Sequence, residues 1–225
     1  MRIASFCFVI GAAILALPGA SVQAAPTIAY HVNAPSSGNF DWADPLGLDF
    51  DVNSPVVVTR VGVFDSDQNG LFRAITFYLY DRNTQQPVVG PLVFQQGETG
   101  TLVGGNRFID IPDVTLPAGF QGAAVAENYG PGESYYDIGG PGGPGGAGAS
   151  VTNDGGGAIS FVGLGRYLND PNGANAGQYP TVIDVGPANR YSTGTFEFDV
   201  IPEPASALVL GAAAGLLLFR RRHHR

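Results

Sequence analysis

Apolar and acidic residues alternate strictly in two short segments, and no other feature constrains the fold of this chain as strongly. In Leu46–Val52 every second residue is apolar, and Asp49 and Asp51 fall between them. Residues 195–200 repeat the pattern, with two phenylalanines and a valine between polar residues. Successive side chains of a strand point to opposite faces of a sheet, so both segments are predicted to be half-buried strands. No part of residues 25–200 shows a sustained apolar stripe of helical period.

Short apolar runs rich in Val, Ile, Phe and Tyr continue between turns that contain glycine and proline. The runs at 56–64 and 71–81 are separated by the turn-forming residues 65–70, which predicts a hairpin. Many short strands separated by turns that contain glycine and proline favour an all-β fold, an antiparallel β-sandwich or barrel. Further strands are predicted at 88–94, 107–111, 121–127, 158–163 and 181–185.

The central part of the chain, residues 25–200, is long enough for one domain with its own core. The glycine-rich run 139–157 offers no side chains to a core and is predicted to be a long surface loop within that domain. A linker between two domains is the alternative.

The first residues have the order of a secretory signal peptide. Arg2 precedes an uncharged apolar stretch, 3–17, and residues 22–24 place small side chains where signal peptidase cleaves. The stretch is shorter than the about 20 residues of a membrane span. Residues 1–24 are therefore predicted to be removed after export through the Sec machinery, with a retained anchor as the alternative. Cys7, the only cysteine, leaves with the signal, so the exported domain has no disulfide.

The other end, residues 201–225, carries three elements in order. Pro202-Glu203-Pro204 comes first, followed by the uncharged residues 205–219 and then by a cluster of arginines. The prolines keep the motif extended. The apolar run would form a helix of about 23 Å, which arginine stems can extend toward the about 30 Å of a bilayer core, with the arginines on the cytoplasmic side. The cluster comprises Arg220, Arg221, Arg222 and Arg225.

This order of elements resembles the PEP-CTERM sorting signal of Gram-negative bacteria, which exosortases process. The resemblance covers residues 201–225 and implies that Pro202, Glu203 and Pro204 are read by an exosortase. It also implies that the C-terminal helix anchors the protein in the inner membrane until processing. An ordinary tail anchor that happens to carry the tripeptide is the alternative.

A second and looser resemblance concerns the domain between the two signals. The residues that carry it are Val61-Gly62-Val63-Phe64-Asp65, Asn69-Gly70-Leu71, Tyr78-Leu79-Tyr80-Asp81 and the segment 191–198. They are similar to a jelly-roll-like β-sandwich domain found in secreted bacterial proteins. The resemblance implies the fold and no activity.

Charge excludes one class of partner. Residues 25–200 carry six arginines against eighteen acidic residues, a net charge of −12. Such a surface repels nucleic-acid phosphates and anionic lipid, and it attracts divalent cations. Binding of nucleic acid is therefore not expected.

Asp65, Asp67 and Asn69, followed by Gly70, match the first half of a calcium loop. Thr76 stands where a helical EF-hand has its bidentate acid. One interpretation is a calcium site in a β loop that takes a further carboxylate from elsewhere. The other is a hairpin loop whose side chains make local turn hydrogen bonds.

Trp42 and the pair Tyr135-Tyr136 are the candidates for sugar binding, because exposed aromatic rings flanked by acids stack on sugar rings. The alternative for Trp42, the only tryptophan, is a role in the core or in anchoring a loop.

No catalytic constellation stands out, and the chain is predicted not to be an enzyme. His31 is the only histidine of residues 25–200, and it is interpreted as a strand residue. Neither a Gly-x-Ser-x-Gly elbow nor paired histidines for zinc occur within residues 25–200. No spacing singles out a pair of glycosidase carboxylates.

These features predict an exported protein of the cell surface or extracellular matrix, with a non-enzymatic structural or adhesive β-sandwich. A carbohydrate-binding module of the exopolysaccharide layer is one alternative, and an unrecognised polysaccharide hydrolase is the other. The expected partners are signal peptidase, the Sec machinery, an exosortase and extracellular polysaccharide. No cofactor is expected apart from calcium at residues 65–70.

Overall fold

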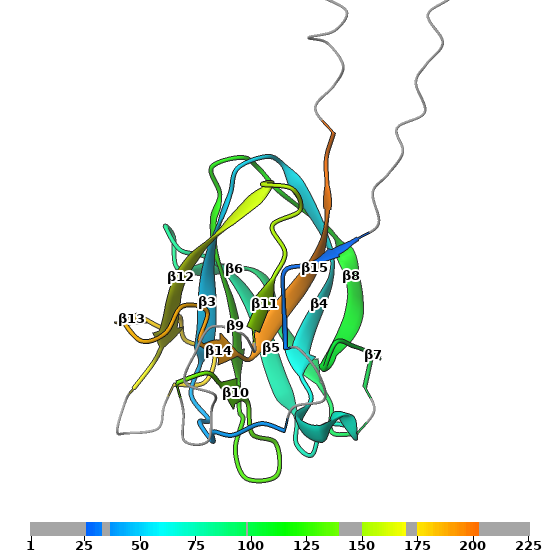
Figure 1. Ribbon diagram of the computed structural model, residues 1–225, viewed down its shortest axis with the longest axis vertical. Helices are drawn as coiled ribbons and strands as arrows, with labels where there is room; N and C mark the ends of the chain where they lie inside the picture. Colours follow the sequence, from blue (N-terminus) through cyan, green and yellow to red (C-terminus); the bar gives the residue numbers. More distant parts are fainter. Residues whose placement is uncertain (1–25, 33–36, 98, 140–149, 170–174, 203–225) are drawn as a thin grey trace, which may run out of the picture.

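Two antiparallel sheets face each other across a shared core, and the larger one curls (Figure 1). The prediction of an all-β, antiparallel fold is confirmed. No helix in the part of the chain that this computed structural model describes is long and apolar enough to cross a membrane. The predicted signal and transmembrane helices lie outside the described residues. These are 26–32, 37–97, 99–139, 150–169 and 175–202.

The smaller sheet has five strands in the order β1-β15-β4-β8-β7. Its central strand, β4, pairs with β15 on one side and with β8 on the other. Neither neighbour is adjacent to β4 in the sequence, so long-range contacts hold this sheet together. Its strands are β1 (Thr27–Ile28), β15 (Gly194–Val200), β4 (Val56–Phe64), β8 (Asn106–Leu116) and β7 (Thr101–Val103).

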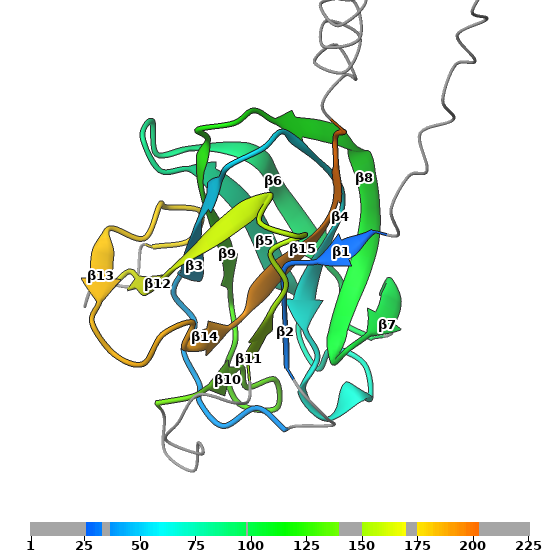
Figure 2. The same cartoon turned by 45° about the horizontal axis from the view of Figure 1, so that its top comes forward.

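The larger sheet has six strands in the order β13-β12-β3-β9-β5-β6. Two short pairs, β10 with β14 and β11 with β2, lie beside the main sheets (Figure 2). The six strands are β13 (Val182–Asp184), β12 (Ile159–Tyr167), β3 (Leu46–Val52), β9 (Gln121–Glu127), β5 (Ile75–Asp81) and β6 (Gln86–Phe94). The short strands are β10 (Tyr136–Asp137), β14 (Tyr191–Ser192), β11 (Ser150–Thr152) and β2 (Tyr30–Val32).

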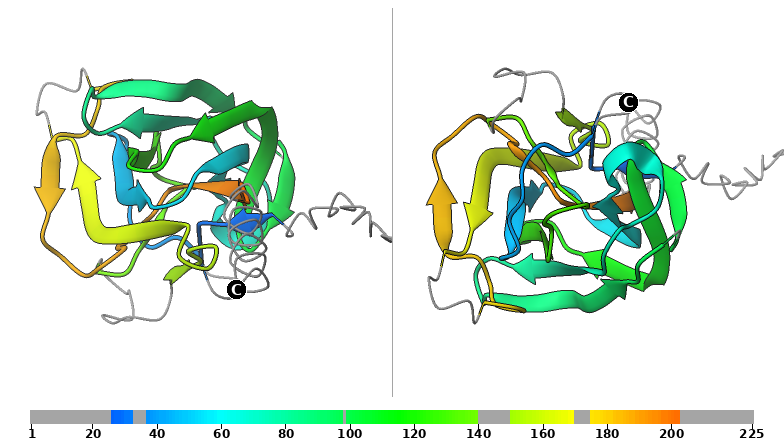
Figure 3. Two further views of the ribbon diagram at one scale, coloured as in Figure 1. Left: turned by 90° about the horizontal axis from the view of Figure 1, so that it is seen from above. Right: turned by 90° about the horizontal axis from the view of Figure 1, so that it is seen from below.

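The core lies between the sheets and is built from alternate positions of the central strands. Leu48 and Phe50 of β3 meet Phe196 of β15, and all three are buried. Val58 and Val61 of β4 both belong to the core although their spacing breaks the alternation. A register shift between Val58 and Arg60 accounts for this, because a bulge returns the next side chain to the same face. Figure 3 shows the strands of the two sheets from above and from below.

Residues 56–64 and 71–81 do not form the predicted hairpin. β4 belongs to the five-stranded sheet and β5 to the six-stranded sheet, so the intervening loop crosses between the sheets. Turn-forming residues indicate a reversal of the chain, but they do not determine which strands pair. The two strands instead bury their apolar faces in the same core from opposite sides.

Most other predicted strands are confirmed, several at their predicted bounds. Residues 46–52, 56–64 and 121–127 form β3, β4 and β9, and His31 lies in β2 as expected. The predicted loop at 139–157 needs correction because it contains β11, whose backbone pairs with β2. Residues 140–149 of that loop lie outside the described residues.

The sandwich has two distinct ends. At the terminal end, β15 runs toward Pro202 and β1 pairs with the last part of β15 (Figure 1). At the opposite, loop end, the segments 37–45, 65–74 and 128–135 gather (Figure 1). The candidate sites are divided between these two ends and the outer face of the larger sheet.

Candidate functional site

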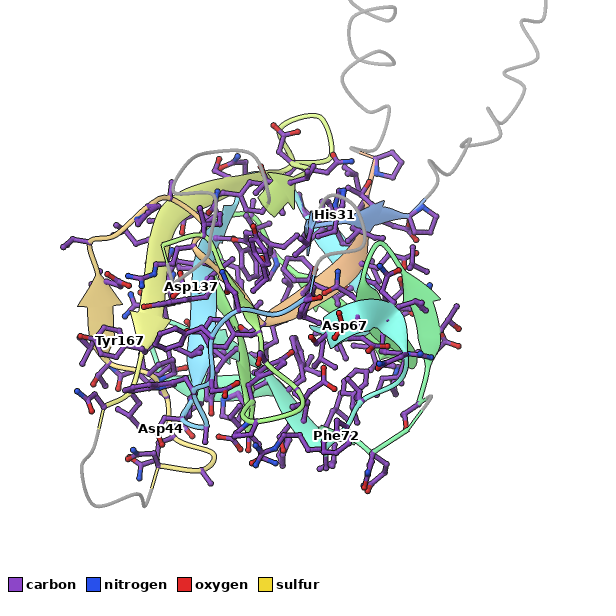
Figure 4. The ribbon with its side chains drawn as sticks, turned by 60° about the horizontal axis from the view of Figure 1, so that its bottom comes forward. His31, Asp44, Asp67, Phe72, Asp137 and Tyr167 are labelled. Atoms are coloured by element: carbon purple, nitrogen blue, oxygen red, sulfur yellow. The ribbon has the colours of Figure 1, made fainter. Side chains whose placement is uncertain are left out.

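The loop after β4 carries the residues predicted to bind calcium and lies at the loop end (Figure 4). It contains a short 3-10 turn, η1 (Ser66–Gln68), within which Asp67 has a φ of 63°. Asp65 is buried, whereas Asp67 and Asn69 are exposed. No three His, Cys, Asp or Glu side chains of the described residues come together as a metal site. Calcium binding here stays a prediction.

Asp65 already has a cationic partner supplied by the protein. The Nε of Arg107, on β8, donates to Asp65 Oδ2 at 2.6 Å, and both residues are buried. The backbone N–H of Gly70 donates to the same oxygen at 3.1 Å. Asp65 Oδ1 is buried and accepts no hydrogen bond from the part of the chain that the structure describes. The first predicted ligand therefore joins the loop to a neighbouring strand.

Glu133 is a second buried acid of the loop end, and sequence reasoning missed it. Its Oε1 accepts the backbone N–H of Ser66 at 2.8 Å, and its Oε2 accepts that of Phe72 at 2.6 Å. Burial raises the pKa of Glu133 to about 7, although these two hydrogen bonds act in the opposite direction. One carboxylate thus clamps both ends of the loop between β4 and β5. The only signal in the sequence is a single acid after the turn Gly130-Pro131-Gly132.

The expectation that Tyr135 and Tyr136 are exposed is wrong. Their exposed fractions are 1% and 9%. The ring of Tyr135 makes edge-on contacts with Phe40 and Tyr129, each at 5.8 Å between ring centroids. An antiparallel backbone bridge also joins Phe40 to Tyr135. Neither tyrosine therefore offers a free ring to a sugar.

Trp42 is half-buried and contacts Tyr167 edge-on at 6.5 Å. This contact agrees with its alternative role as a loop anchor. The aromatic ring that is exposed at the loop end is Phe72, at 64% (Figure 4). A Cβ placed on Gly132 would lie 2.4 Å from that ring, so the ring rests on this glycine.

The outer face of the six-stranded sheet carries a network of ion pairs around Asp49. Arg166 donates to both carboxylate oxygens of Asp49 at 2.6 and 2.8 Å, and Arg82 reaches Asp49 at 3.4 Å. Arg82 also pairs with Asp51. Asp49 is 1% exposed, so β3, predicted to be half-buried, is covered on its polar face as well as on its apolar face.

A tyrosine cluster lies beside this network. The rings of Tyr78 and Tyr80 stack at 5.4 Å, and Tyr179 meets Tyr80 edge-on at 5.3 Å. Tyr78 donates to Glu127 at 3.1 Å, and the N–H of Gly177 donates to the same carboxylate at 2.8 Å. Burial raises the pKa of Tyr78 to about 12 and also raises that of Glu127. The cluster is closed by its own contacts, which makes it a second small core.

The sorting motif starts at the terminal end of the sandwich. β15 ends at Val200, and the N–H of Ile201 donates to the carbonyl of Pro55 at 3.0 Å. Pro202 is exposed. The rest of the predicted motif and the arginine cluster, Glu203, Pro204, Arg220, Arg221, Arg222 and Arg225, lie outside the described residues.

The comparisons with known proteins give only partial similarity. A stretch of 87 residues is 32% identical to UDP-GalNAc:beta-1,3-N-acetylgalactosaminyltransferase 2 of Xenopus tropicalis and, equally, to that of Xenopus laevis. The stretch covers 38% of this chain and 18% of each relative, so the chain spans less than a fifth of these curated relatives. No family model and no solved structure matches the chain.

Proposed function

We propose that this chain is an exosortase-sorted protein of the cell surface or extracellular matrix, whose jelly-roll-like sandwich has a structural or adhesive role without catalysis. The observation that supports this most strongly is the place of Pro202-Glu203-Pro204. The motif begins two residues after the end of β15, and the intervening Ile201 is still bonded to Pro55. Only one residue thus separates the predicted motif from the last strand of the folded domain.

The contacts that the buried acids make support a role without catalysis. Asp49 and Asp65 are paired with arginines, and Glu127 accepts bonds from a tyrosine and a backbone N–H. A hydrolytic acid must be able to reach a substrate. These carboxylates are instead enclosed by contacts that stabilise the fold.

Glu203→Ala tests the proposal in a host that has an exosortase. A tail anchor needs only the apolar helix and the arginines, whereas the sorting enzyme reads the acid between two prolines through a charge-assisted hydrogen bond. We expect the variant to be exported, to lose its signal peptide and to keep its arginine tail. Intact mass of the membrane-bound and surface forms measures this.

Ser206→Ala, which lies in the apolar run and leaves the motif intact, is the matched control and should mature like the wild type. Maturation of Glu203→Ala to the wild-type mass would leave only the tail-anchor interpretation.

Carbohydrate binding is a second candidate, supported by the exposed ring of Phe72 at the loop end. The relatives with partial similarity are named as transferases of a sugar, N-acetylgalactosamine. Phe72→Ala and Trp42→Ala should then abolish binding on a glycan array. Val185→Ala removes an apolar side chain that is even more exposed, from another part of the surface, and should have no effect. Glycan binding that survives both aromatic substitutions would exclude this site.

A further inference from the structure

An open groove lies where the chain leaves the sandwich for the sorting motif. Its volume is about 230 Å³, and strands β4, β8 and β15 all contribute to it. The first residues after β15 form part of its lining, so the groove and the start of the motif are one continuous surface. The lining includes Val57, Thr59, Asp113, Asp199, Ile201 and Pro202.

The short distance between the domain and the membrane segment limits how an enzyme can reach the motif. Ile201 is held by Pro55, so only residues 202–204 separate the folded domain from the apolar run that begins at Ala205. Three extended residues span at most about 11 Å. A folded domain of 100 residues has a radius of gyration of about 13 Å. An enzyme that encloses these three residues must therefore also touch the terminal end of the sandwich.

The carboxylate of Asp113 lines the groove and forms no ion pair with any of the residues that the structure describes. Arg60 is engaged by Asp110 at 3.1 Å and by Glu197 at 3.0 Å. Asp113 is exposed in the groove, where Asp199 is its acidic neighbour. A partner that fits this surface would place a basic side chain there.

We infer that this groove is a docking surface for the enzyme that processes the sorting motif, and that it receives a basic side chain of that enzyme beside Asp113. The inference rests on the proposed function and deepens it, because recognition then extends from the tripeptide onto the folded domain. The apolar side of the groove, Val57 and Ile201, would meet the same enzyme surface.

The test follows maturation of the full-length chain by intact mass in a host with an exosortase, at intervals after synthesis is stopped. Asp113→Asn should slow loss of the arginine tail about two- to fivefold, the effect of one partly screened charge contact. Asp110→Asn is the matched control: it makes the same change on the same strand, outside the groove, and should mature at the wild-type rate. Thermal melts verify that both variants are folded.

A second variant carries six Gly and Ser residues inserted between Ile201 and Pro202. The insertion separates the motif from the groove, so it should slow maturation at least as much as Asp113→Asn does. Adding Asp113→Asn to the insertion variant should then slow the loss of the arginine tail no further.

Wild-type rates for Asp113→Asn, or maturation of the insertion variant as fast as wild type, would overturn the docking surface and leave the proposed function intact. A wild-type chain that keeps its tail, as Glu203→Ala does, would overturn the proposed function itself.

Discussion

At the loop end of the sandwich Asp65 is buried and pairs with Arg107, whereas at the terminal end Asp113 is exposed beside an open groove. Both acids belong to the same strongly acidic domain. Arg107 of a distant strand and the nearby backbone N–H of Gly70 both donate to Oδ2 of Asp65, whereas Asp113 is exposed to solvent. The difference indicates that Asp65 fixes the fold of the loop end, while Asp113 of the terminal end is available to a partner.

The largest expected effect is that of Arg107→Met. It leaves the buried carboxylate of Asp65 without its cation, which costs about 3–5 kcal/mol of folding free energy. Urea unfolding at neutral pH measures the loss. Asp110→Asn, which removes the exposed partner of Arg60 and leaves the bond between Arg60 and Glu197, should cost about 1 kcal/mol or less.

The double variant Asp65→Asn, Arg107→Met should recover part of the loss, because no buried charge then remains unpaired. If Arg107→Met cost no more than Asp110→Asn, the loop end would not depend on this pair and the contrast between the ends would disappear.

Glu133→Gln is expected to change how stability depends on pH. Burial raises the pKa of Glu133 from 4.5 to about 7, so the folded state binds the proton more tightly than the unfolded state. Its contribution is present below about pH 4.5 and is lost as the pH rises through about 7, an effect of about 3 kcal/mol at most. In the variant, the free energy of unfolding should lack this decrease with rising pH. Denaturation curves recorded at intervals from pH 4 to pH 8 measure it.

Glu127, whose pKa burial also raises, should maintain a smaller slope in that variant. Glu127→Gln is therefore the matched control, because it removes the pH dependence of stability that Glu127 contributes and leaves that of Glu133. Identical pH profiles for wild type and Glu133→Gln would contradict the raised pKa of Glu133.

The strands could be predicted from sequence because their period is local. Leu48 and Phe50 alternate with acids, and this is enough to place β3 at its observed bounds. Pairing could not be predicted, since β4 bonds to β8 and β15, whose residues lie far along the chain. The turn-forming cluster after β4 therefore suggested a hairpin that does not exist.

The candidate sites show the same division between local and distant information. The Asp65–Gly70 pattern is local and was found, but its partner Arg107 and the clamp Glu133 come from other segments. Asp49 was expected on a solvated face because no nearby residue covers it. Arg82 and Arg166 cover it, and only the folded sheet brings them there.

Calcium provides a further test of the loop end. An ion that binds only the folded state stabilises it by about 2.7 kcal/mol at a hundredfold excess over the dissociation constant. The predicted site at Asp65, Asp67 and Asn69 should thus raise the melting temperature in millimolar calcium relative to chelator. Asp67→Asn should remove that rise. An unchanged melt would mean that Arg107 is the only cation Asp65 binds.

The smallest expected effect is at the terminal end, where Asp113→Asn should change the free energy of unfolding by no more than about 0.5 kcal/mol. The sign should be stabilising, because residues 25–200 carry a net charge of −12 and the variant removes one repelling charge from the folded surface. The gain should shrink as salt is added, since exposed charges are screened within about 10 Å at 0.1 M. Urea unfolding of Asp113→Asn beside Asp65→Asn measures the contrast directly. A destabilisation by Asp113→Asn comparable to that by Asp65→Asn would show that the groove acid is structural, and the two ends would then not differ in the way proposed.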